Sequence, residues 1–474
     1  MPALSRRKAL KTMAAASLVP TLGAHALPAR AATAVAPTGS AAVASGATKA
    51  AWSNWSGSAK AASASLQTPA DAAAVQQLFR ETTGVVRCVG AGHSFTPLVP
   101  TDGTILSLDR MAGLIGHNKS TMTASFHAGT RLAQLSRQLD LVGMGLRNLP
   151  DIDAQSFAGA ISTATHGTGA ELPALHADVQ ALQIVTPRGE LLECSATKQP
   201  DLFAAAKVSL GSLGVLTQAT TTVLPAYGLQ RKVWLKPVEE LLQIAPTLAQ
   251  QHRHFEFYYL PFTGYAAAIT HDVYTGTEVV HPEAADEEML RDLRHLRDWL
   301  GRFPDLRRWV AKKLIDPNQT ELAQDRSWKL LSTQRPTKFN ETECHVPREL
   351  GIACVREIIQ VLERRNDVFF PMEFRFIKAD DAWLSPFYQR DSCSIAVHAA
   401  VGEPYDYLVP EIAPVFRKFQ GRPHWGKLHG HTAADLSALY PRWKDFLAVR
   451  AQLDPTGRML NPHLRSLFGI AQSA

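Results

Sequence analysis

The sequence has few cysteines for its length: 474 residues contain only 5, and no two of them are spaced as CxxC. This absence excludes zinc-ribbon and thioredoxin-type sites. An odd number leaves at least one thiol unpaired within the chain, and we expect most of them to be small buried hydrophobic residues. The histidines of HWGKLHGH (His424, His429 and His431) have no acidic ligand beside them and match no zinc spacing. The sequence therefore predicts no metal site.

Charged residues are also scarce, at 19% of the chain against 46% hydrophobic residues. This composition excludes an intrinsically disordered chain and, with the length, predicts two or three folded domains. The formal net charge is +6, but the first 31 residues contain no acid and several basic residues (Arg6, Arg7, Lys8, Lys11 and Arg30). Without that segment the chain is almost neutral, which argues against a nucleic-acid partner.

Long hydrophobic runs are absent too. The apolar stretch near the N-terminus is short and interrupted by Pro20 and Gly23, so we expect no integral membrane span in the mature chain. That stretch follows a twin arginine and ends in an A-x-A type sequence at residues 29–31. This layout predicts a twin-arginine-type signal peptide over residues 1–31 and a periplasmic or otherwise exported protein. An ordinary Sec signal and a basic helical start are the alternatives.

Composition divides the rest of the chain into three segments. Residues 32–65 are rich in Ala, Ser, Thr and Gly and are predicted to be a linker. Residues 66–228 alternate short β-branched runs such as TILSLD with Gly-rich turns and helical stretches. Residues 229–474 combine helical patterns such as ELGIACVREIIQVLERR with strand patterns such as SCSIAVHAA. We therefore expect two α+β domains, with a helix over about 440–453 near the C-terminus.

Three Gly-rich turns occur in the first of these domains. They are GAGHSF at 90–95, SFAGAISTATHGTG at 156–169 and SLGSLGVLT at 209–217. Small residues and backbone N–H groups in such turns suit the cradling of a polyphosphate, although ordinary tight turns have the same composition. Phe95 stands where GxGxxG has its third glycine, and no acidic partner follows, which disfavours a nicotinamide dehydrogenase.

These turns, followed by PMEFRF and HWGKLH, resemble the FAD-linked oxidases of the vanillyl-alcohol oxidase superfamily, in particular their sugar-lactone and alditol branch. The resemblance covers roughly residues 66–465. It implies a PCMH-type FAD-binding domain over 66–228 and an α+β substrate-cap domain over 229–474, whose C-terminal segment, including Asn461 and Pro462, returns to the flavin. In the same comparison His424 belongs to a loop beside the flavin, and Trp425 is expected to be a packing residue.

The resemblance implies that FAD is the cofactor and that His93 is joined covalently to the flavin 8α-methyl. A neutral imidazole is a suitable nucleophile near pH 7; the alternative is that His93 only hydrogen-bonds a phosphate. Ser156 stands where the family has a serine near flavin and substrate, whereas His166 is either a cofactor residue or a structural histidine. The predicted cofactor-binding residues are Cys88, Val89, Gly90, Ala91, Gly92, His93, Ser94, Ser156, Gly159, Ile161, Ala164, Thr165, His166, Gly167 and Val215.

The segment PMEFRF predicts a strand whose alternate side chains share a face. Glu373 and Arg375 then point one way, opposite the apolar face, either as a solvated ion pair or, as the resemblance implies, as active-site residues. His398 and Lys427 complete the predicted catalytic set. Either Glu373 or His398 receives the hydroxyl proton of the substrate, and Arg375 or Lys427 stabilises negative charge beside the flavin.

The resemblance implies oxidation of an aldono-1,4-lactone of the gulono, galactono or arabinono type at C2. The alternatives are an alditol oxidase and a periplasmic flavin- or sugar-binding protein without turnover, which the polar residues above argue against. The expected partners are a sugar lactone or polyol and an electron acceptor, for which oxygen, a cytochrome and a quinone all stay open.

Overall fold

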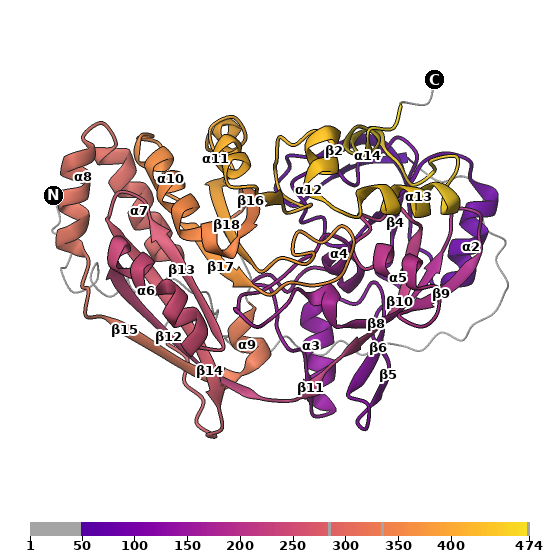
Figure 1. Ribbon diagram of the computed structural model, residues 1–474, viewed down its shortest axis with the longest axis horizontal. Coiled ribbons are helices and arrows are strands. Elements are labelled where there is room, and N and C mark those ends of the chain that lie inside the picture. The colour runs from indigo at the N-terminus through magenta and orange to yellow at the C-terminus, as the bar shows by residue number, and fades with distance from the viewer. Residues whose placement is uncertain (1–48, 283–285, 333–335, 472–474) are drawn as a thin grey trace, which may run out of the picture.

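The computed structural model describes residues 49–282, 286–332 and 336–471, so the predicted leader at 1–31 lies outside the described residues. Two lobes lie side by side (Figure 1). We call the lobe built mainly from the first half of the chain the FAD lobe, after the domain that the family resemblance implies, and the lobe built from most of the second half the cap lobe. Both contain helices and sheets, as the α+β prediction requires. Among the described residues, no helix has both the length and the apolar character needed to cross a bilayer.

The FAD lobe begins with a four-stranded sheet in the order β1-β2-β4-β3. Its strands are β1 (Lys49–Ser53), β2 (Lys60–Gln67), β3 (Val86–Val89) and β4 (Thr104–Ser107), and helix α2 (Ala72–Glu81) connects β2 to β3. The expectation of a linker over 32–65 is wrong for its second half, because β1 and most of β2 lie there. Small residues hid these strands: Ala61 and Ala64 are buried and pack with Val99 and Ile105 in a small core.

A second, antiparallel sheet has the order β5-β6-β10-β8-β9. Its strands are β5 (Leu114–Asn118), β6 (Thr123–His127), β8 (Val179–Val185), β9 (Leu191–Ser195) and β10 (Val215–Thr222). The remaining elements of this lobe are α3 (Leu132–Leu141), β7 (Met144–Gly145), α4 (Phe157–Ser162), η1 (Leu175–Asp178), α5 (Pro200–Ala206) and β11 (Leu224–Pro225). Of the predicted Gly-rich turns, 90–95 follows β3 and 209–217 leads into β10, whereas 156–169 begins with helix α4 and is a turn only after it.

The cap lobe is built on an eight-stranded sheet in the order β15-β12-β14-β13-β17-β18-β16-β19. The strands are β12 (Gly228–Pro237), β13 (His254–Leu260), β14 (Tyr265–Tyr274), β15 (Thr320–Arg326), β16 (Phe339–Pro347), β17 (Met372–Ile377), β18 (Ser392–Ala400) and β19 (Arg422–Pro423). Its helices are α6 (Val238–Gln251), α7 (Asp286–Leu300), α8 (Pro304–Leu314), α9 (Ser327–Leu331), α10 (Gly351–Glu363) and α11 (Ala413–Lys418), with short turns η2 (Arg348–Leu350) and η3 (Asp406–Leu408).

Alternation along the strands gives this sheet two different faces. Phe257 and Phe374 stack with ring centroids 4.8 Å apart on one face, in the core that includes residues of α6 and α10. Glu373 and Arg375 point to the other face, as the sequence predicted. That face is buried as well, so its charged groups are shielded from water rather than solvated.

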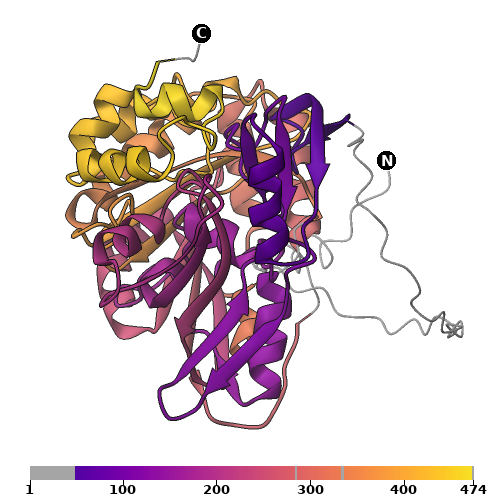
Figure 2. The same ribbon diagram turned by 90° about the vertical axis from the view of Figure 1, so that its right-hand side faces the viewer.

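The C-terminal segment crosses back to the FAD lobe, as the family resemblance implies. Helices α12 (Ala433–Leu439), α13 (Trp443–Leu453) and α14 (Pro462–Phe468) share one hydrophobic core with the FAD-lobe sheets, and Figure 2 shows them beside that lobe. The Asn461 amide donates to the carbonyl oxygens of Pro97 and Pro100, at 2.9 Å each. The HWGK loop itself is joined to the turn that carries His93, because the Phe95 backbone N–H donates to the Gly426 carbonyl at 2.6 Å.

Candidate functional site

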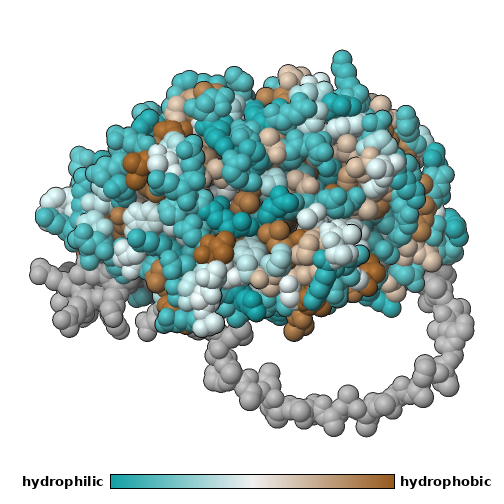
Figure 3. All heavy atoms as spheres, turned by 60° about the horizontal axis from the view of Figure 1, so that its bottom comes forward, coloured by the Kyte–Doolittle hydropathy of each residue, from teal (hydrophilic) through white to brown (hydrophobic). Residues whose placement is uncertain are grey.

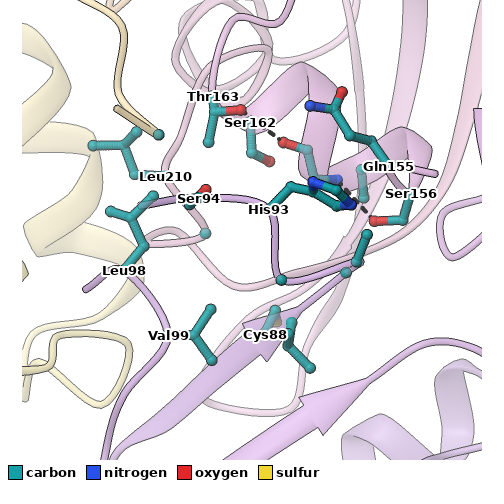
Figure 4. Close-up of a pocket in the computed structure, with 18 of the residues that line it drawn as sticks. Cys88, His93, Ser94, Leu98, Val99, Gln155, Ser156, Ser162, Thr163 and Leu210 are labelled. Carbon is teal, nitrogen blue, oxygen red and sulfur yellow. Dashed lines mark hydrogen bonds between the residues drawn. The ribbon is translucent and has the colours of Figure 1, made fainter. Parts of the chain in front are cut away.

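A large pocket lies in the FAD lobe where the three Gly-rich turns and the HWGK loop meet. It encloses about 1240 Å³ including its open mouth. Figure 4 shows Leu98 and Leu210 on one side and Gln155 and Ser156 on the other, with His93 between them. The predicted cofactor residues on its wall are Cys88, Val89, Gly90, Ala91, Gly92, His93, Ser94, Ser156 and Gly159.

Close backbone approach shapes this pocket. A Cβ added at Gly90 would lie 2.1 Å from the Ser156 Oγ, so only glycine lets the 90–95 turn pack against the start of α4. The same Oγ accepts a hydrogen bond from the Gly159 backbone N–H at 3.3 Å, which fixes the serine as the N-cap of α4. Apolar side chains and glycine backbone along an open groove of this size fit the extended shape of FAD.

His93 is held by a segment that sequence analysis assigned to a linker. The Trp55 ring stacks on the His93 imidazole with centroids 4.9 Å apart and an interplanar angle of 26°. The Trp55 N–H donates to the Gly92 carbonyl at 2.8 Å, and the Asn54 amide donates to the Ser94 carbonyl at 2.9 Å. Burial, followed by the positive charge of Lys427, lowers the pKa of His93 to about 4. The imidazole is therefore neutral near pH 7, as a nucleophile requires.

The other predicted cofactor residues lie elsewhere. Thr165 and His166 line a second, neighbouring pocket. The remaining predicted residues lie in the packed interior and do not line either pocket: Ile161, Ala164, Gly167 and Val215. Val215 does not line the first pocket because side chains alternate along strand β10. Its neighbour Leu216 faces that pocket, so Val215 faces the core.

The second pocket adjoins the first at the boundary between the lobes. The residues that line both are Ile152, Gln155, His424 and Lys427. The second pocket also brings together the whole predicted catalytic set from three separate parts of the cap lobe: Glu373, Arg375, His398 and Lys427. A substrate in this pocket would lie directly against a ring bound in the first one.

Arg375 is the centre of a buried cluster of charges. Its guanidinium pairs with Asp151 and Glu373, and its Nε donates to Glu256 at 3.2 Å. The Tyr258 hydroxyl donates to Glu373, and its oxygen lies 3.0 Å from the Asp151 carboxylate. Burial, reinforced by the neighbouring carboxylates, raises the pKa of Glu373 well above its usual value. The neighbouring carboxylates also raise the pKa of Arg375, against the effect of its burial, so Arg375 stays charged.

Strand β16 adds two buried carboxylates that sequence analysis missed. Lys427 pairs with Glu341 and lies 3.8 Å from Glu343. Ser394 donates to Glu343 at 2.5 Å, and the His166 Nε2 lies 2.9 Å from the same oxygen. Burial raises the pKa of Glu341 to about 7. Burial alone would raise that of Glu343 too, but His424, His166 and Lys427 around it hold its pKa well below the usual range.

His398 is oriented by a backbone carbonyl. Its Nδ1 lies 3.0 Å from the Pro371 carbonyl oxygen, which can only accept a hydrogen bond, so Nδ1 carries the proton. In the neutral ring Nε2 is then the basic nitrogen. It lies on the pocket side, 3.6 Å from Glu341. A protonated His398 would be stabilised by that carboxylate.

Among the described residues, two groups of side chains are close enough to hold a metal ion: His166 with Glu343 and His345, and Asp151 with Glu256 and Glu373. In the second group the Arg375 guanidinium already supplies the positive charge. In the first group, Glu343 is already hydrogen-bonded by Ser394 and His166.

Trp425 is a packing residue, as expected. It is buried, and its Nε1 donates to the Leu384 carbonyl at 2.6 Å.

Comparisons with known proteins agree with this layout. A family model described as D-arabinono-1,4-lactone oxidase matches residues 219–467, and one described as FAD binding domain matches residues 61–195. The chain is 33% identical to the L-gulono-1,4-lactone dehydrogenase of Mycobacterium tuberculosis, over 88% of this chain and 99% of that protein. It is 30% identical to the L-gulonolactone oxidase of Bos taurus, over 83% and 92%.

More distant similarities extend the comparison. The alditol oxidase of a Streptomyces species is 25% identical over 88% of this chain and 98% of that protein. Among solved structures, a cholesterol oxidase from B. sterolicum superposes with a TM-score of 0.73, covering 92% of this chain and all of that one, at 17% identity. At this identity the structural match concerns the fold alone, and it confirms the two-lobed α+β architecture.

Proposed function

Because the chain belongs to the D-arabinono-1,4-lactone oxidase family, with an FAD binding domain preceding that region, we propose that it oxidises an aldono-1,4-lactone of the gulono, galactono or arabinono type at C2. The product would be an ascorbate-type enediol. The observation that carries this proposal is the pair of adjoining pockets, one with the shape and lining that suit FAD and one lined by buried charges. Bound FAD supplies a ring that accepts a hydride from the substrate carbon.

The second pocket suits a ligand with many oxygens and little apolar surface. Arg375 and Lys427 are the cations on its wall, and Tyr258 adds a hydroxyl. Glu373 adds a carboxyl group that can accept a hydrogen bond from a sugar hydroxyl. Because these groups are hydrogen-bonded to one another, their positions are set before the substrate arrives. Such preorganisation makes them effective at stabilising charge that develops during the reaction.

The hydroxyl proton goes to His398 in this proposal, rather than to Glu373. The Glu373 carboxylate already accepts hydrogen bonds from the Tyr258 hydroxyl and the Arg375 guanidinium, so it is engaged within the buried cluster. His398 has its basic nitrogen on the pocket side, and Glu341 lies close enough to stabilise the cation that forms. Histidine oriented by one partner and stabilised by a carboxylate is an effective general base.

Covalent attachment through His93 is part of the same proposal. His93 would form a C–N bond from its neutral ring nitrogen to the 8α carbon of FAD. This bond would replace the imidazole N–H bond and one methyl C–H bond with release of two protons, and the two electrons left over would have to pass to the external electron acceptor. Stacking on Trp55 and the closeness of Gly92 and Ser94 keep the ring in one orientation while this occurs.

Initial rates with a dye as electron acceptor test the substrate assignment. The proposal predicts that kcat/KM for L-gulono-, L-galactono- or D-arabinono-1,4-lactone exceeds that for xylitol or sorbitol by at least tenfold. A reverse order would favour an alditol oxidase, the activity named for the Streptomyces relative. No turnover of either class would support the binding-protein alternative. Replacing the dye by oxygen, cytochrome c or a quinone identifies the acceptor.

Export is proposed on the sequence of the leader alone. The twin arginine and the A-x-A end within residues 1–31 support a twin-arginine signal. This route carries folded proteins, which suits a cofactor that must be inserted before export. Fractionation of cells producing the full chain tests it: lysine in place of both arginines should keep the protein in the cytoplasm.

A further inference from the structure

A group of exposed aromatic side chains lies at the end of the cap lobe that is remote from the FAD lobe, on helices α7 and α8 and the turn between them (Figure 1). Trp299 is 82% exposed, Phe303 61% and Trp309 60%, and Leu306 beside them is 46% exposed. We call these four residues, with Arg302, Lys312 and Lys313, the α7–α8 surface. Elsewhere, the face drawn in Figure 3 is mostly hydrophilic, and its hydrophobic residues lie in small separate patches.

The orientation of α8 is fixed by its inner side. Arg307 and Ala311 are buried, the Arg307 guanidinium donates to the Val368 carbonyl at 2.9 Å, and it lies over the Phe262 ring at 4.2 Å. Since residues three and four apart share a helix face, Leu306 and Trp309 must then point outward. The exposed aromatic residues are therefore held on a rigid helix rather than on a loop.

Charged groups of both signs occur on these two helices. The carboxylates next in sequence to Trp299 and Leu306 are paired within the protein, Asp298 with Arg297 at 2.6 Å and Asp305 with Arg308 at 2.9 Å. Within the described residues, no ion pair involves the three exposed cations of the surface, which are Arg302, Lys312 and Lys313. The surface thus combines large aromatic rings with three exposed cations for which the described residues provide no ion pair.

We propose that the α7–α8 surface docks the protein on a membrane rich in anionic phospholipid. Tryptophan and phenylalanine side chains favour the headgroup region, where the ring is partly apolar and the indole N–H stays hydrated. Lysine and arginine beside them are attracted to anionic headgroups. The helix would lie on the bilayer without crossing it.

A second copy of the chain fits this surface less well. A two-fold dimer would place each patch against itself, and the three cations of one copy would then face the same three cations of the other, which is unfavourable. Neither α7 nor α8 contributes a residue to the two pockets. Membrane docking would therefore leave the entrance to the catalytic site unaffected, and the proposal does not depend on the identity of the substrate.

Flotation with lipid vesicles tests the proposal. The full chain is used with its leader cations Arg6, Arg7, Lys8 and Lys11 replaced by glutamine, because these would bind anionic vesicles themselves. The parent protein should float with vesicles of phosphatidylglycerol and phosphatidylcholine in equal parts, and about tenfold less with pure phosphatidylcholine or at high salt. No flotation with the anionic vesicles overturns the proposal.

Two variants separate the aromatic and basic contributions. Trp299→Ser/Phe303→Ser/Trp309→Ser and Arg302→Gln/Lys312→Gln/Lys313→Gln should each lower binding about tenfold or more and leave kcat/KM in solution unchanged. Leu141→Ser, which changes an exposed leucine at the end of α3, is the matched control and should bind like the parent. Binding that survives both triple variants overturns the proposal. A parent that is dimeric in solution and becomes monomeric in the aromatic variant would instead assign the surface to a second copy.

Discussion

The two walls of the site are built in opposite ways. The flavin wall consists of turns whose glycines let backbones approach closely, as Gly90 does at Ser156. The substrate wall consists mainly of side chains on strands of one antiparallel sheet, joined by Lys427 and Asp151 from neighbouring loops, and its carboxylates and cations are buried together around Arg375 and Lys427. Cofactor binding thus depends on backbone shape, and substrate chemistry depends on buried charge. We therefore expect mutations in the flavin wall to lower FAD binding, and mutations in the substrate wall to lower turnover.

The largest expected effect is on the substrate wall. Arg375→Ala leaves Asp151, Glu256 and Glu373 without their shared cation, and losing one preorganised charge of this kind lowers turnover by about 10³-fold. FAD content should stay close to that of the wild type, because Arg375 does not line the first pocket. Arg375→Lys keeps the charge and should recover part of the activity. Flavin loss equal to the activity loss would contradict the separation of the two walls.

The flavin wall should respond to a single methyl group. In Gly90→Ala the added Cβ meets the Ser156 Oγ at 2.1 Å, and rotating that hydroxyl away breaks the cap of α4. Overpacking of this kind costs about 1–3 kcal/mol, so we expect FAD affinity to fall about ten- to a hundredfold. The measurement is the ratio of flavin to protein absorbance after purification.

The matched control for this change is Gly116→Ala, because no atom lies within 4 Å of the added Cβ there. It should bind FAD like the wild type. Normal FAD content in Gly90→Ala would show that the 90–95 turn does not form the tight wall described above.

A smaller effect is expected at the junction of the N-terminal segment with the flavin wall. Trp55→Ala removes the ring that stacks on His93, and an aromatic contact is worth about 0.5–1.5 kcal/mol. The rate of covalent flavin incorporation should therefore fall up to about tenfold, while Trp55→Phe should retain most of it. Flavin fluorescence of the protein band after denaturing electrophoresis measures this, with His93→Ala as the blank. Equal fluorescence in wild type and His93→Ala would exclude attachment at His93.

The smallest change concerns pH. Burial raises the pKa of Glu341 to about 7, so this carboxylate gains its charge, and its ability to stabilise protonated His398, only as pH rises through 7. Wild-type kcat/KM should rise across that range, and Glu341→Gln should flatten the profile. Because the folded pKa of Glu341 lies above the usual 4.5, the wild type also loses folding stability as pH rises from about 4.5 to about 7, whereas the variant lacks this loss. Glu349→Gln, an exposed change just after β16, should leave the profile unaltered.

The sequence predicted one wall better than the other for physical reasons. Turns such as GAGHSF are local, so their glycines can be read directly, and the alternation in PMEFRF correctly placed Glu373 and Arg375 on one face. Glu341 and Glu343 alternate in the same way along β16, but alternating charges are also typical of a solvated strand. These two carboxylates are buried by packing against a lobe that is distant in the sequence. Their burial therefore cannot be predicted from the residues near them in the chain.

The N-terminal segment was missed for a related reason. Its strands are built from alanine and serine, which are also typical of linkers, and β2 is ordered by parallel pairing with β4. Trp52 and Trp55 are the large residues that distinguish this segment from a linker, and both contact the His93 turn. An aromatic pair within a stretch of small residues was the available indication.

The most direct test of the account is to mix the purified protein anaerobically with L-gulono-1,4-lactone and record the flavin absorbance. The account predicts that the oxidised flavin spectrum of the wild type is bleached, and that Arg375→Ala carries the same flavin but is bleached about 10³-fold more slowly. Flavin that no aldonolactone reduces, or that Arg375→Ala reduces as fast as the wild type, would contradict it.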